Sequence, residues 1–189
     1  TPSAPAPEAA SDTGVDQPTQ AGVPMWMVFS ANSAGYSVFV NAGPLTICAA
    51  MNGHLLIGAS TSGGLSQINF VSDRTSVRID SATEYFIHAQ ISTRNTNSAV
   101  SGTTVALVSR VVNDVAMTAL PNAPVDVATG LPVPTIAVAT NGGVSVIKDD
   151  GNVWDITGSS ATYGYSKHVA FDKNGHLRFS LGKIGRAHV

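Results

Sequence analysis

From Pro24 onward, hydrophobic residues occur in short runs that end at Gly, Asn, Asp or Ser. The runs are rich in Val, Ile, Thr and aromatic residues, which is typical of β-strands. No segment has the sustained ~3.6-residue periodicity of an amphipathic helix. The pattern predicts an antiparallel, all-β chain with strands at MWMVF, YSVFV, LTICAAM, HLLIGAS, LSQINFV, SVRI, TVALVSRVV, TIAVAT, GVSVIK, NVWDIT, HVAF and HLRFSL.

Turn residues separate many of these runs. Asn-Gly pairs supply the positive φ angles of tight hairpins, Gly-Gly pairs give a second kind of turn, and Asp-Asp-Gly makes a three-residue hairpin loop. We therefore predict structural turns at Asn52, Gly53, Gly63, Gly64, Asn141, Gly142, Gly143, Asp149, Gly151, Asn174 and Gly175.

The same succession of strand, Gly-Gly, strand, polar turn and strand occurs twice, after Gly53 and after Pro134. Its two Gly-Gly pairs are about two periods of roughly 40 residues apart, and four consecutive antiparallel strands are the wiring of a β-propeller blade. We expect four-stranded, blade-like repeats that form part of a propeller, with a β-sandwich as the alternative. Residues 84–100 and 121–134 fit no strand of the repeat.

Composition divides the chain into three parts. Residues 1–23 are rich in Pro, Ala and acidic residues and have no aromatic residue, so we expect a disordered linker. Residues 24–182 carry the strand pattern, and we expect them to be a fragment of a propeller-like repeat domain. The residues KIGRAHV (183–189) match the translation of a sequencing adapter, so we expect a non-native tail.

The charge balance excludes several classes of partner. Charged residues make up 12% of the chain, with 10 basic and 12 acidic side chains, so there is no basic patch for nucleic acid or an anionic membrane. No apolar run reaches the ~18–20 residues that span a bilayer. Cys48 is the only cysteine, and we expect it to be a small buried residue. We expect neither nucleic-acid binding nor membrane insertion.

Few residues are candidates for chemistry. His54 and His176 each follow an Asn-Gly turn, but metal ligands need converging partners, so we interpret both as strand-edge residues. The DKNG segment at 172–175 is interpreted as a tight turn rather than a calcium loop. Carboxylates for glycoside hydrolysis would have to come from a set without a motif, namely Glu84, Asp114, Asp126 and Asp155. We predict no catalytic residue, no metal site and no cofactor.

The two tryptophans, Trp26 and Trp154, are predicted to pack between blades, because a buried indole covers a large apolar area. Stacking of an exposed Trp on a sugar ring is the alternative.

The segment Val112–Thr157 contains VNDVAM, LPVPTIAVAT and GGVSVIKDDG. It resembles a module of large virion proteins of marine bacteriophages and related environmental sequences, where these stretches recur between propeller-like repeats. MWMVF, MNGHLLIG and GGLSQINFVSD resemble the preceding part, so the resemblance covers about residues 25–182. Asp149, Gly151 and Trp154 are also similar to part of the Asp box of sialidase-type propellers, which is a structural turn; Ile147 and Val153 depart from it.

The resemblance implies a non-enzymatic structural or host-recognition scaffold of a bacteriophage virion, associated with the tail or a fibre. Its partners would be other virion proteins, further copies of the chain, or a host-surface protein or glycan. We expect loops such as 84–100 and 119–134 to form the contact surface. A secreted carbohydrate-active or sialidase-like propeller and a bacterial surface adhesin, both extracellular or on the cell surface, stay open as alternatives.

Overall fold

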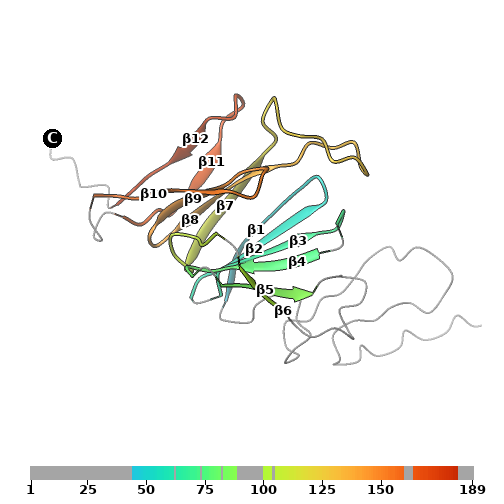
Figure 1. Cartoon of the computed structure of the whole chain (residues 1–189). Coiled ribbons are helices and arrows are strands. Elements are labelled where there is room, and N and C mark those ends of the chain that lie inside the picture. Colours follow the sequence, from blue (N-terminus) through green and yellow to red (C-terminus); the bar gives the residue numbers. More distant parts are fainter. Residues whose placement is uncertain are drawn as a thin grey trace, which may run out of the picture.

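The computed structural model describes residues 44–61, 63–72, 74–81, 83–88, 100–103, 105–159 and 164–182. Every regular element in these ranges is a β-strand, and all strand pairs are antiparallel. The strands form three open sheets stacked in layers (Figure 1). The predicted all-β, antiparallel class is confirmed.

The first sheet is a six-stranded meander in which each strand pairs with the next. Its strands are β1 (Leu45–Met51), β2 (His54–Ala59), β3 (Leu65–Asn69), β4 (Arg74–Arg78), β5 (Thr83–His88) and β6 (Val100–Thr103). Residues 84–100 were expected to fit no strand of the repeat, but both ends of this segment belong to strands that pair with each other. TEYFIH has the aromatic and β-branched residues of a strand. The polar residues that follow it gave no sign of its partner strand, β6.

The second sheet contains four strands in the order β10-β9-β8-β7. They are β7 (Val112–Thr118), β8 (Thr135–Thr140), β9 (Gly143–Ile147) and β10 (Val153–Ile156). Its four antiparallel strands agree with the expected four-stranded unit, and β8, β9 and β10 are the strands predicted at TIAVAT, GVSVIK and NVWDIT. β7 (VNDVAMT) was not predicted as a strand.

The strand predicted at TVALVSRVV (104–112) is wrong, because the strand begins only at Val112. The N–H of Leu107 donates to the carbonyl of Ile79 at 2.9 Å. The N–H of Val108 instead donates to the Ser145 hydroxyl at 2.9 Å. The segment's hydrogen bonds thus go to two different sheets, so it connects the sheets instead of joining one ladder.

The third sheet is the hairpin of β11 (Val169–Phe171) and β12 (Leu177–Phe179). The Asp172 carboxylate orders its turn by accepting the N–H groups of Asn174 and His176 at 2.9 and 3.0 Å. Gly175 supplies a positive φ of 78°. The DKNG segment is therefore a tight turn, as interpreted from the sequence.

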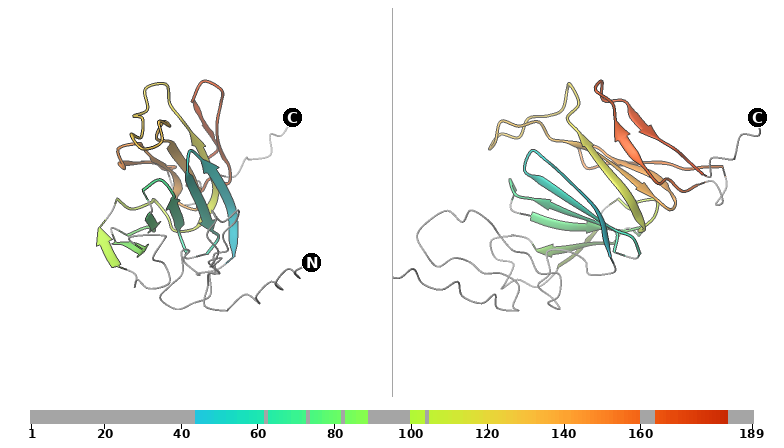
Figure 2. Two further views of the ribbon diagram at one scale, coloured as in Figure 1. Left: turned by 90° about the vertical axis from the view of Figure 1, so that its right-hand side faces the viewer. Right: turned by 180° about the vertical axis from the view of Figure 1, so that it is seen from behind.

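The second sheet is the middle layer, and its β7 and β8 strands have a neighbouring sheet on each face (Figure 2). All six residues of β8 are buried. Ile136 and Val138 pack with Leu56 and Leu65 of the first sheet, while Ala137 and Ala139 of the same strand pack on the other side with Val169 of β11. A continuous apolar run such as TIAVAT is typical of a strand buried on both faces.

One of the three predicted Asn-Gly turns has positive φ at both residues. Asn52 and Gly53 have φ of 48° and 77°, as a type I′ hairpin turn requires, whereas in the pair Asn174–Gly175 only Gly175 has positive φ. Asn141 and Gly142 lie in a turn as predicted, but the expectation of positive φ is wrong for this pair, because it occurs one residue later, at Gly143 (141°). The side chain of Asn141 instead accepts a hydrogen bond from the Asn113 amide at 3.0 Å.

Two predicted buried residues are exposed. Trp154 lies on β10 and is 66% exposed, so the expectation that it packs between layers is wrong for the described structure. Cys48 is also exposed, because its neighbours Ile47 and Ala49 on β1 point toward the core and successive side chains alternate. Trp26, MWMVF, YSVFV, residues 1–23 and residues 183–189 lie outside the described residues. Within the described ranges, no helix is long and apolar enough to cross a membrane.

The glycine turns of the second sheet offer a direct test of the fold. Gly143 and Gly151 both have positive φ, but a Cβ at Gly143 would overlap the Ile156 carbonyl oxygen, whereas a Cβ at Gly151 would meet nothing within 4 Å. We expect Gly151→Ala to cost about 1–2 kcal/mol of backbone strain. Gly143→Ala should cost about 3 kcal/mol or more, because a clash adds to the strain. Urea denaturation of both variants measures the difference, and equal midpoints would contradict the turn geometry.

Candidate functional site

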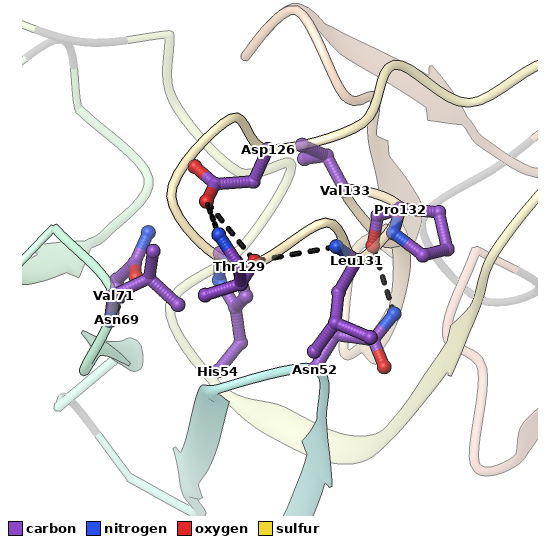
Figure 3. A pocket seen from close by; sticks show the side chains of 9 residues that line it. All are labelled: Asn52, His54, Asn69, Val71, Asp126, Thr129, Leu131, Pro132 and Val133. Carbon is purple, nitrogen blue, oxygen red and sulfur yellow. Dashed lines mark hydrogen bonds between the residues drawn. The ribbon is translucent and has the colours of Figure 1, made fainter.

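A small pocket of about 60 Å³ lies where three connecting segments meet (Figure 3). They are the β1–β2 turn, the β3–β4 turn and residues 119–134, which form the β7–β8 arm. The lining residues are Asn52, His54, Asn69, Val71, Asp126, Thr129, Leu131, Pro132 and Val133. The pocket has room for solvent-sized groups and is too small for a sugar ring.

The β7–β8 arm is ordered by the side chain of Asp126. One carboxylate oxygen accepts the N–H groups of Ala128 and Thr129 and the Thr129 hydroxyl, at 3.0, 2.9 and 3.0 Å. The backbone N–H of Asp126 also donates to the carbonyl of Leu131 at 2.9 Å, and Gly130 turns the chain with a φ of 68°. The insertion between VNDVAM and TIAVAT therefore forms a structured arm with a hairpin-like tip.

Asn52 holds the arm against the first sheet. Its side-chain amide donates to the carbonyl of Pro132 at 2.8 Å, while its backbone adopts the positive φ of the turn. The neighbouring Gly53 lies close to Val71, because a Cβ on Gly53 would come within 2.7 Å of the Val71 Cγ2 atom. The three loops are thus packed together, and the predicted turn residues Asn52 and Gly53 are part of the pocket as well as of the hairpin.

His54 is half-buried in the pocket. Burial lowers the pKa of its imidazole below the ordinary value of 6.5, and the nearby Asp126 carboxylate opposes this shift. The sequence placed His54 correctly at the start of a strand but gave no sign of the arm above it. The turn signal in DVATG, an Asp followed by Thr and Gly, would have predicted the arm's tip.

The two histidines of the repeat do not converge. His176 lies on the third sheet, where its Nδ1 atom is 3.2 Å from the Asp172 carboxylate. Within the described residues, no three His, Cys, Asp or Glu side chains are grouped to hold a metal ion. The acidic turn residues instead hydrogen-bond their own turns. Asp150 accepts the backbone and side-chain N–H groups of Asn152, both at 2.9 Å, which lowers the pKa of its carboxyl.

Two of the candidate hydrolytic carboxylates lie at opposite edges of the second sheet. Asp114 on β7 accepts the N–H of Val169 from the third sheet at 3.1 Å, whereas Asp155 on β10 accepts the Ser145 hydroxyl at 2.6 Å. Three strand spacings separate β7 from β10, or roughly 14 Å, and paired glycosidase carboxylates lie within about 5–9.5 Å of each other. The side chain of Glu84 lies outside the described residues.

His54 predicts a pH dependence of stability. Because its folded pKa is lower than its unfolded pKa of 6.5, the unfolded chain binds the proton more readily, and stability falls as the pH drops through 6.5. We expect His54→Gln to lose less unfolding free energy than the parent between about pH 7.5 and about pH 5. Urea denaturation at the two pH values measures this, with His168→Gln, whose side chain is 89% exposed, as the matched control. A His54→Gln variant with the parent's pH dependence would contradict the prediction.

Comparison with known proteins adds no family to this description. No protein-family model, no curated protein and no solved structure matches the chain.

Proposed function

We propose that this chain is a non-enzymatic structural or host-recognition scaffold of a bacteriophage virion, associated with the tail or a fibre. Its rigid body is a stack of blade-like sheets that forms part of a β-propeller. Its loops, above all the β7–β8 arm, make the contacts with partners. Those partners are other virion proteins, further copies of the chain, or a host-surface protein or glycan.

The position of β7 carries the propeller part of the proposal. β7 lies against β1 and β2 on one side and against β11 on the other, so the first strands of the three sheets lie side by side (Figure 2). The second sheet packs on the first sheet with one face and on the third sheet with the other. Propeller blades stack in this manner around an axis, whereas a β-sandwich has a single interface between two sheets.

The tip of the β7–β8 arm supports a contact function. Val127 is fully exposed, and Val125 and Leu131 are 57% and 43% exposed. Apolar side chains gathered on an ordered, projecting loop are typical of a surface that binds another protein. The arm is held by Asn52 and by its own Asp126, so it presents these side chains in a fixed arrangement.

The separation of Asp114 and Asp155 counts against the carbohydrate-active alternative. Both carboxylates already accept hydrogen bonds from the fold, and they lie on strands at opposite edges of one sheet. A hydrolase would need other groups to supply its acid and its nucleophile or base.

Proteomics of purified particles tests the virion assignment. Trypsin should release the peptide from Val111 to Lys148, and we expect it in density-banded, nuclease-treated particles of a phage that carries the gene. Its presence only in cells or in particle-free medium would overturn the assignment and favour the secreted alternatives.

The contact role of the arm has its own test in the same phage. Because Val127 is fully exposed, Val127→Asp should leave the unfolding midpoint unchanged but reduce incorporation of the chain into particles or attachment of particles to the host. Thr157→Asp, at an exposed position after β10, is the matched control. Equal incorporation and attachment for both variants would remove the arm from the proposed contact surface.

A further inference from the structure

We propose that Asn174 is a site of spontaneous deamidation in the folded chain, whereas the fold protects the two other Asn-Gly pairs. Those pairs begin at Asn52 and Asn141, and all three lie within the described ranges. The modification is a property of the third sheet and does not depend on the virion assignment.

Deamidation at an Asn-Gly pair needs only water. The backbone nitrogen of the glycine gives up its proton and attacks the Cγ atom of the Asn side chain, which forms a C–N bond and closes a five-membered succinimide ring. The bond from Cγ to Nδ2 breaks, and the side-chain nitrogen takes up a proton and leaves as ammonia. Water then opens the ring at either carbonyl and gives aspartate or isoaspartate. Glycine favours the attack because it has no Cβ to block the approach.

The β7–β8 arm holds the side chain of Asn52. Its Nδ2 atom donates to the carbonyl of Pro132 at 2.8 Å, so the Cγ atom is fixed toward the arm. Asn52 is half-buried and lines the pocket beneath Thr129 and Pro132 (Figure 3). The side chain can turn toward the nitrogen of Gly53 only after this hydrogen bond has broken.

Both reacting groups of the second pair are held. The side-chain oxygen of Asn141 accepts a hydrogen bond from the Asn113 amide at 3.0 Å. The nitrogen that would attack belongs to Gly142, and its N–H donates to the hydroxyl of Thr140 at 3.1 Å. Reaction at Asn141 therefore requires two hydrogen bonds to break at once.

The side chain of Asn174 has no such hold. It is exposed at the tip of the β11–β12 hairpin, and no described residue hydrogen-bonds to it. The N–H of Gly175 donates to the carbonyl of Asp172 at 2.9 Å, so the turn must open before the nitrogen can react. The hairpin has strands of only three residues, and within the described part of the chain β12 pairs with β11 alone. Short two-stranded hairpins are marginally stable and open locally.

The modification would change the turn that it occurs in. Isoaspartate adds one carbon to the main chain before Gly175, and either product adds a carboxylate to a turn that the Asp172 carboxylate already organises. Both changes weaken the hairpin. Because Val169 of β11 packs on the buried alanines of β8, the cover on this face of the second sheet would loosen as the product accumulates.

Parallel incubation of the folded chain and of the chain in urea, in mildly alkaline buffer, tests the proposal. Trypsin releases residues 174–178 as the peptide NGHLR. Liquid chromatography with tandem mass spectrometry separates its Asn, Asp and isoaspartate forms and localises the reaction at the two other pairs. We expect the folded rate at Asn174 to lie within about threefold of its rate in urea, and the folded rates at Asn52 and Asn141 to lie about tenfold or more below theirs.

Asn174→Gln is the matched control. It should abolish the product at this position, because the longer side chain would have to close a larger ring. Equal folded rates at the three pairs, or suppression at Asn174 as strong as at Asn52 and Asn141, would overturn the proposal.

Asp126→Ala tests the protection of Asn52 by the arm. The arm tip lies outside the packed clusters, so the variant should keep its fold while the tip loses its three hydrogen bonds to Asp126. We expect the folded rate at Asn52 to rise, with the rates at Asn141 and Asn174 unchanged. An unchanged rate at Asn52 would overturn the protective role of the arm.

Discussion

Burial of β8 on both faces is the constraint on which the rest of the structure depends. TIAVAT has no position that faces water, so it is stable only while one neighbouring sheet covers Ile136 and Val138 and another covers Ala137 and Ala139. The two faces also differ in size. The larger side chains face the first sheet, and the alanines allow β11 to approach closely on the other side. A layer with two buried faces requires a neighbour on each, which is the physical basis of a stack.

Polar groups fix the order in which the layers follow one another. Ser145 is buried in the middle sheet, where its hydroxyl accepts the N–H of Val108 from the connecting segment and donates to Asp155. On the other face, Asp114 accepts the N–H of Val169 at the start of β11. Buried polar groups need partners, so each bond sets where the chain enters or leaves the middle sheet.

The sequence predicted the strands of the second sheet because their local signals agree with the fold. TIAVAT, GVSVIK and NVWDIT combine β propensity with glycine turns, and pairing between neighbours along the chain needs no distant information. The prediction failed where contacts between residues far apart in the sequence determine the local structure. TVALVSRVV has the composition of a strand, yet its N–H groups bond to Ile79 and to Ser145. For the candidate site, the turn residues Asn52 and Gly53 were identified, but the arm that buries His54 was not, because Asn52 contacts Pro132 from 80 positions away.

The way the β7–β8 arm is held separates its exposed tip from the packed layers of the molecule. Asp126 organises the tip through bonds within the arm itself, and the side-chain hydrogen bond from Asn52 to Pro132 links the arm to the first sheet. Neither the tip nor its exposed Val127 belongs to the clusters that hold the sheets together. Residues at the tip can therefore change without disturbing the buried layers, whereas a change in β8 affects two interfaces at once. Surface loops tolerate substitution while a two-sided core does not, so this division would suit the proposed scaffold.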